Sequence, residues 1–186
     1  MTYLINRSIN DYKWIDIVET NVGEEDELSV GRKLIKLRGK PLPHDFGLIN
    51  VEWTRGTRRG RKVADFPNSS FALLFMSFAA HDAMYSLLDP NGSWIKLIGL
   101  DYIAFYCEQW VDAIDDARTT AALQKIDYGS LHSPTFVPIL RCDRIPLCDI
   151  FQAVGTPGKF FVSQQFRDKY ENWRLTGLEF SEVTLV

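Results

Sequence analysis

Phe160-Phe161-Val162-Ser163 is an apolar run that ends in a serine, and Asp168 follows five residues later. Apolar residues return at Leu178-Glu179-Phe180, directly after Gly177. A continuous apolar run is typical of a buried strand. The serine can cap a following helix, because its hydroxyl accepts a hydrogen bond from an amide of the first turn. The stretch therefore predicts a strand–helix–strand unit over residues 158–183, with a helix at Gln164–Trp173 that Gly177 terminates.

The same pattern occurs earlier, at Leu74-Phe75-Met76-Ser77, Asp82 and Trp94-Ile95-Lys96-Leu97-Ile98. Ser77 and Ser163 are 86 positions apart, and so are Asp82 and Asp168. We therefore expect one unit used twice, near residues 71–98 and 158–183, with Ser77 and Ser163 as helix caps. An apolar face is predicted on the first helix, formed by Phe78, Met84, Tyr85 and Leu88.

Strands dominate the remaining pattern. Apolar or alternating segments predict strands at Tyr3–Ile5, Trp14–Val18, Leu34–Leu37, Ile49–Trp53 and Tyr102–Tyr106, and strand pieces broken by Pro138 and Pro146 at Val137–Leu140 and Ile150–Val154. The aromatic spacing in residues 101–112 also fits a helix, and the strand is favoured there because it closely follows another strand. Residues 113–123 are more polar and predict a loop or a short helix. The predicted fold class is α+β: a mixed sheet with two strand–helix–strand repeats and the helices packed on the sheet. We expect one domain over residues 1–186, with a strand-rich N-terminal part at 1–64.

Composition excludes several classes of protein. The 186 residues are 46% hydrophobic and 24% charged, with a formal charge of −3, so we expect no binding to nucleic acid. Cys107, Cys142 and Cys148 lack the spacing of a zinc site and predict buried free thiols, with no metal and no cofactor. The start of the chain does not read as a signal peptide, and the apolar run at 71–80 is too short for a membrane span. These features predict a cytoplasmic protein without membrane contact.

Two acidic groups are candidate partner-binding sites. They are Glu108 with Asp112, Asp115 and Asp116, and the run Glu24, Glu25, Asp26 and Glu27. Carboxylates in this density can pair with basic side chains of a partner, and a solvated surface is the plain alternative. The basic loop Arg55–Lys62 has the same plain alternative, because a single aromatic residue, Trp53, accompanies it.

No motif points to catalysis. His44, His81 and His132 stand apart, and Ser163 lies in Val-Ser-Gln-Gln instead of the glycine-flanked elbow of a serine hydrolase. Pro157 makes Gly155–Gly158 a turn instead of a phosphate cradle. We therefore expect no enzyme and no catalytic residues. The five tryptophans are expected in or near the core, but two exposed together would be natural anchors of a binding face.

The order of segments from Asp65 to Val183 resembles the myxobacterial-type immunity-protein family of bacterial polymorphic toxin systems. The resemblance lies in Asp65-Phe66-Pro67, the strand ending at Ser77, Val111–Asp115, Asp149-Ile150-Phe151, and the closing segments at Phe161–Ser163 and Leu175–Phe180. The chain departs from the family at Ser77-Phe78-Ala79-Ala80-His81, which is more apolar than the usual charged start of that helix. This departure predicts that the helix is either buried or part of an interface.

The resemblance implies a protein that binds a cognate toxin and neutralises it by occlusion. Two alternatives stay open: a small enzyme or ligand-binding domain with a site between the two repeats, and an adaptor that binds an effector without inhibiting it. Paired repeats can also form a self-complementary face, so a homodimer stays open as well.

Overall fold

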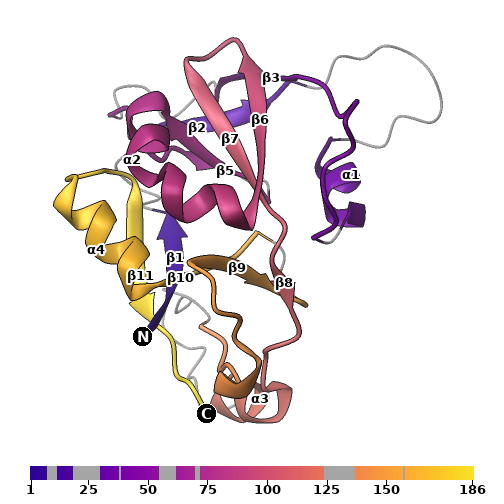
Figure 1. The fold of residues 1–186 in the computed structure, drawn as a ribbon, viewed down its shortest axis with the longest axis vertical. Coiled ribbons are helices and arrows are strands. Elements are labelled where there is room, and N and C mark those ends of the chain that lie inside the picture. The colour runs from indigo at the N-terminus through magenta and orange to yellow at the C-terminus, as the bar shows by residue number, and fades with distance from the viewer. Residues whose placement is uncertain are drawn as a thin grey trace.

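Two mixed β-sheets and the helices packed on them form the protein in the computed structural model, which describes residues 1–7, 12–18, 30–37, 39–54, 62–69, 72–123, 137–156 and 158–186 (Figure 1). The helices are α1 (Val30–Leu37), α2 (Phe78–Leu88), α3 (Asp116–Leu123) and α4 (Gln164–Asn172), with 3-10 turns η1 (Asp89–Asn91) and η2 (Cys142–Arg144). The strands are β1 (Thr2–Arg7), β2 (Trp14–Ile17), β3 (Ile49–Trp53), β4 (Asn68–Ser69), β5 (Leu74–Ser77), β6 (Gly92–Ile98), β7 (Tyr102–Cys107), β8 (Trp110–Val111), β9 (Ile150–Ala153), β10 (Phe160–Ser163) and β11 (Leu178–Glu182). The predicted α+β class is confirmed.

Both predicted repeats exist, and each is a split strand–helix–strand unit. One sheet has the order β4-β2-β3-β6-β7-β5 and the other β11-β1-β10-β9-β8. In the first sheet β7 lies between β5 and β6 and pairs antiparallel with both. In the second, β1 lies in the same way between β10 and β11. The two strands of each repeat are therefore parallel to each other and separated by a strand from outside the repeat.

The two capping serines are confirmed, and each is held by an aspartate. Ser77 Oγ accepts from the Ala80 amide at 3.2 Å and donates to Asp65 at 3.0 Å. Ser163 Oγ accepts from the Phe166 amide at 3.1 Å and donates to Asp149 at 2.6 Å. A hydroxyl that both donates and accepts is fixed in orientation, so each aspartate orients its cap toward the helix.

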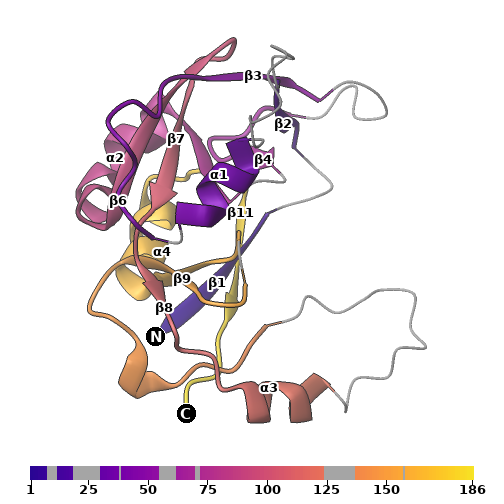
Figure 2. The same ribbon diagram turned by 90° about the vertical axis from the view of Figure 1, so that its right-hand side faces the viewer.

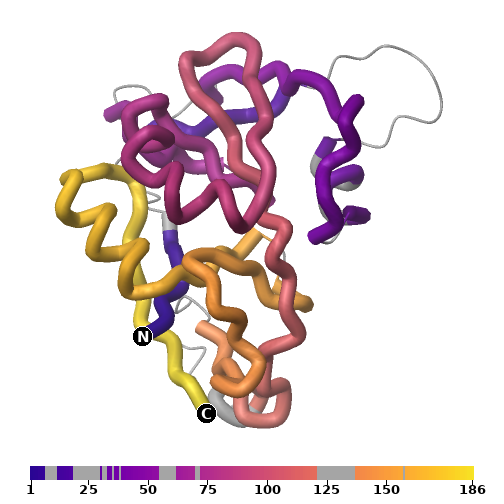
Figure 3. Tube along the Cα trace, viewed as in Figure 1, coloured from indigo at the N-terminus to yellow at the C-terminus, as the bar shows by residue number. Residues whose placement is uncertain are grey.

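One hydrophobic core joins the repeats. Alternate residues of β1, β5, β7 and β10 point into it, for example Tyr3, Met76, Phe105 and Phe160. Helices α2 and α4 cover this core and lie next to each other, with Lys169 Nζ donating to Ser86 Oγ at 2.8 Å (Figure 2). The opposite face of each sheet has its own core, one of them closed by α1 through Leu34. The tube in Figure 3 shows that both ends of the chain lie in the half of the molecule that holds the sheet of β1.

Two predicted strands are wrong. Residues Leu34–Leu37 belong to α1 instead, and Val30, Leu34 and Leu37 pack on one core at helical spacing while Lys33 and Lys36 are exposed. A four-residue apolar run does not distinguish a strand from a helix. At Val137–Leu140 only Leu140 makes β-bridges, with Ile114 and Leu185. Pro138 has no amide proton to donate to a ladder.

The predicted bounds of α4 agree to within one residue, but Gly177 is wrong as the signal that ends it. The helix ends at Asn172, and the residue in the left-handed conformation is Arg174, with φ of 52°. Gly177 lies beyond the helix at the start of β11. A Cβ atom at Gly177 would collide with the backbone oxygen of Phe66, so this glycine allows two chain segments to approach closely.

No helix in the described part of the chain is long and apolar enough to cross a membrane.

Candidate interaction surface

The acidic group at 108–116 is divided by β8. Glu108 precedes this strand and accepts a hydrogen bond from Ser93 Oγ on β6. Asp112, Asp115 and Asp116 follow it, next to α3. Asp115 accepts from the Arg118 amide at 2.9 Å and therefore caps α3. The structure thus does not bring Glu108 together with the three aspartates.

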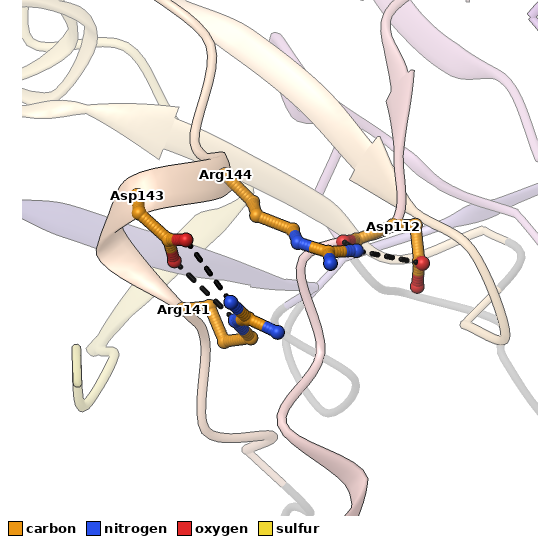
Figure 4. A network of polar contacts seen from close by, with 4 residues as sticks. All are labelled: Asp112, Arg141, Asp143 and Arg144. Carbon is orange, nitrogen blue, oxygen red and sulfur yellow. Dashed lines mark hydrogen bonds and ion pairs between the residues drawn. The ribbon is translucent and has the colours of Figure 1, made fainter.

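Arginine side chains are interleaved with these aspartates. Arg144 donates to Asp112 at 3.0 Å, and Arg141 contacts Asp143 through two nitrogens, at 3.0 and 3.3 Å (Figure 4). The hydrogen bond from Arg141 holds the pKa of Asp143 below its usual value. The pKa of Arg141 is raised by that bond, with smaller contributions from Asp115 and Asp112. The surface is therefore a mixture of both charges and not an acidic patch.

Several other sequence predictions concern residues with no described position. The acidic run Glu24–Glu27, His132 and the basic loop up to Arg61 lie outside the described residues.

Of the cysteines, Cys107 is buried, Cys148 is half-buried, and Cys142 is exposed, so the prediction of buried thiols is wrong for Cys142. Within the described ranges, no three His, Cys, Asp or Glu side chains are grouped as a metal site would require.

Helix α2 exposes aromatic side chains that the sequence pattern assigned to its buried face. Its buried residues are Ala80, Ala83, Met84, Leu87 and Leu88. Phe78 and Tyr85 instead have 54% and 45% of their surface exposed. With His81 and Asp82 they form the outer surface of the helix, which we call the α2 face. The predicted apolar face is therefore correct for Met84 and Leu88 and wrong for Phe78 and Tyr85.

The rings of the α2 face continue onto β6. The imidazole of His81 lies with its centroid 4.5 Å from the Trp94 ring and 5.3 Å from the Tyr85 ring. Tyr85 and Trp94 are stacked at 5.9 Å, with their planes 10° apart. Trp94 is half-buried and rests on Phe105 of the core. Trp94 thus lies beside an exposed tyrosine ring and not beside a second exposed tryptophan. Trp173 is 61% exposed, so the expectation that the tryptophans lie in or near the core is wrong for Trp173.

A pocket adjoins this cluster. It has a volume of about 450 Å³ and is lined by Trp94, Ser93, Ile95 and the segment Leu42–Gly47, which includes His44. A second pocket, of about 380 Å³, lies near Met1, Cys148 and Ser163. Between the repeats, by contrast, Met84, Phe105 and Phe166 are fully buried and fill the space with core side chains.

Helix α4 provides an internal comparison for α2. At the same offset of 86, Gln164, Arg167 and Glu171 stand where α2 has Phe78, His81 and Tyr85. These polar residues form hydrogen bonds with one another or with neighbours on the helix: Gln164 donates to Asp168 at 2.7 Å, and Arg167 donates to Glu171 at 2.7 Å. Two buried positions match, since Ala80 and Met84 correspond to Phe166 and Tyr170, whereas the buried Ala83, Leu87 and Leu88 correspond to the unburied Lys169, Trp173 and Arg174. This alignment of the two helices is the signal in the sequence that separates the exposed aromatics from the buried ones.

No family model matches this sequence, and neither does any curated protein.

Proposed function

We propose that this chain is an immunity protein, which binds a cognate toxin domain and neutralises it by covering the toxin's functional surface. The proposal combines the family resemblance of residues 65–183 with the exposed aromatic residues of α2. Neutralisation by occlusion does not require catalytic residues in the immunity protein. We place its action in the cytoplasm, where such a toxin would meet it.

The carrying observation is the difference between α2 and α4. Both helices have the same serine cap and the same place in a split repeat, and both buried residues of α4 align with buried residues of α2. Helix α4 shows that this architecture accepts a polar, hydrogen-bonded outer face. The fold therefore does not require Phe78 and Tyr85 to be aromatic, and leaving them in water forgoes the stabilisation that burial would give. Exposed rings grouped in this way are characteristic of protein-binding surfaces.

The sequence left two readings of the apolar segment Ser77–His81: a buried helix or an interface. Phe78 and Ala79 are exposed, whereas Ala80 is buried. The exposed start of α2 thus favours the interface. The aspartates at 112, 115 and 116 stay a second candidate contact surface, with Asp116 exposed in the first turn of α3.

Co-expression with the protein encoded next to this chain tests the proposal. Growth of the host is scored with and without this chain, and the complex is then purified through a tag on one partner. Restored growth together with a stable complex is the expected result. A complex that forms without restored growth would support the adaptor function instead of immunity. If growth is not restored and no complex forms, the proposal is contradicted.

A further inference from the structure

The stacked pair of Tyr85 and Trp94 is joined by a carboxylate. Trp94 Nε1 donates to Asp89 Oδ1 at 3.0 Å, and Asp89 follows directly on the last residue of α2. A hydrogen bond with Asp89 also raises the pKa of the Tyr85 phenol. Two aromatic side chains from different elements therefore hold this carboxylate in place at the surface. Because an ionised carboxylate has about four acceptor sites, Asp89 keeps capacity for a further donor.

The charge around the pair favours a cation. From Phe78 to Asn91 the chain has two acidic residues, Asp82 and Asp89, and neither lysine nor arginine. The faces of tyrosine and tryptophan rings carry partial negative charge as well, and they attract cations within about 6 Å. Two lysines belong to neighbouring elements: Lys169 is bonded to Ser86, and Lys96 lies on the same side of β6 as Trp94, two residues further along.

We infer that Tyr85, Trp94 and Asp89 form a receptor for an arginine side chain of the protein partner. This inference rests on the proposed function and specifies the chemistry of the partner. A guanidinium group is planar, so it stacks on an aromatic ring while its edge donates to a carboxylate. A lysine ammonium is a compact, strongly hydrated charge and satisfies only part of this arrangement. The site is open at the surface, as a side chain presented by another protein requires, because Tyr85 and Asp89 are exposed.

The test uses two synthetic peptides, hexa-arginine and hexa-lysine, which have the same charge. Each is titrated into the full-length ¹⁵N-labelled protein while the indole N–H resonance of Trp94 is followed, assigned with Trp94→Phe. We expect this resonance to shift and saturate with hexa-arginine, at an affinity about tenfold higher than with hexa-lysine. Asp89→Asn and Tyr85→Ala should each weaken hexa-arginine binding by about fivefold to tenfold. Asp168→Asn, which removes an exposed carboxylate from α4, should leave the affinity unchanged.

Equal affinity for both peptides, or no shift of the Trp94 resonance, would overturn the receptor. An equal loss for Asp168→Asn and Asp89→Asn would do so as well, because only bulk charge would then be acting. A homodimer in sedimentation experiments that Tyr85→Glu dissociates would assign the surface to a second copy of the chain and would also overturn the inference.

The same experiment separates this inference from the proposed function. Selective arginine binding at Trp94 together with failed co-expression would support the receptor and remove immunity. A toxin complex that forms equally well with Asp89→Asn and Tyr85→Ala would keep immunity and remove the receptor.

Discussion

Asp65 connects the two repeats, and its replacement by alanine tests how much this connection contributes to stability. One oxygen of its carboxylate accepts from Ser77 Oγ, the cap of α2. The other accepts from the Thr176 amide at 3.0 Å and from the Thr176 hydroxyl at 2.8 Å, just before β11. Asp149 accepts a hydrogen bond from the equivalent cap, Ser163. Among the described residues, Asp149 has no second partner that corresponds to Thr176.

The expected magnitude follows from these bonds. Hydrogen bonds to a charged acceptor contribute about 1.5 to 3 kcal/mol each, and less when the group is partly exposed, as Asp65 is. At about 1 to 1.5 kcal/mol for each of its three bonds, Asp65→Ala should lower the free energy of unfolding by about 3 to 4.5 kcal/mol. Asp149→Ala, the matched control, should lower it by about 1 to 1.5 kcal/mol.

Urea denaturation of both variants measures the difference, provided that the slope of the transition is unchanged. Thr176→Val, alone and combined with Asp65→Ala, completes a double-mutant cycle. We expect a coupling energy of about 1 kcal/mol or more between the two positions. Equal losses for Asp65→Ala and Asp149→Ala, with no coupling to Thr176, would refute the reasoning.

Three further predictions concern reactivity, pH and charge. Because burial raises the pKa of Cys107 to about 12 and that of Cys148 to about 11, the folded protein should show one fast-reacting thiol at pH 8, which Cys142→Ser removes; two fast thiols would contradict this. Burial raises the pKa of Tyr102 and of Tyr170 to about 12, whereas the pKa of an unfolded tyrosine is about 10. The stability that these two residues contribute should therefore be complete below pH 10 and lost as the pH rises toward 12. Urea midpoints that stay constant over this range would count against this prediction. Replacement of Asp112, Asp115 and Asp116 by lysine should weaken binding to a basic toxin. The single variant Asp116→Lys spares the ion pair of Asp112 and the cap at Asp115, and unchanged toxin affinity of this variant would remove this surface from the account.

The sequence was sufficient where structure is local. Ser77 and Ser163 are recognisable as caps because a capping hydroxyl acts on an amide three residues ahead. Strand segments such as Phe160–Ser163 are recognisable by their apolar runs. What the pattern could not provide is the partner strand in the middle of the second repeat. That strand is β1 for the second repeat, more than 150 residues away from β10 in the chain, and no local signal encodes such a pairing.

The candidate surface was missed for a related reason. An aromatic residue in an amphipathic helix is usually assigned to the core, so Phe78 and Tyr85 were counted with Met84 and Leu88. The actual buried face includes the small residues Ala80 and Ala83 beside Met84, Leu87 and Leu88, and α2 packs on β5 and β7. The acidic residues at 112–116 were recognisable as a group, but Arg144, which pairs with Asp112, lies 32 positions later in the chain. Whether charges are neutralised depends on such tertiary neighbours.

The central claim, that the α2 face binds the toxin, is tested most directly by giving α2 the outer residues of α4. The variant Phe78→Gln, His81→Arg, Tyr85→Glu has a precedent for folding in the second repeat of the same chain. Its affinity for the purified toxin domain is measured by calorimetry beside the wild-type protein and the control Glu171→Tyr on α4. We predict a loss of affinity of about thirtyfold or more for the α2 variant, since exposed aromatic anchors contribute about 2 kcal/mol or more, and no change for the control. Wild-type affinity in the folded α2 variant would contradict the account.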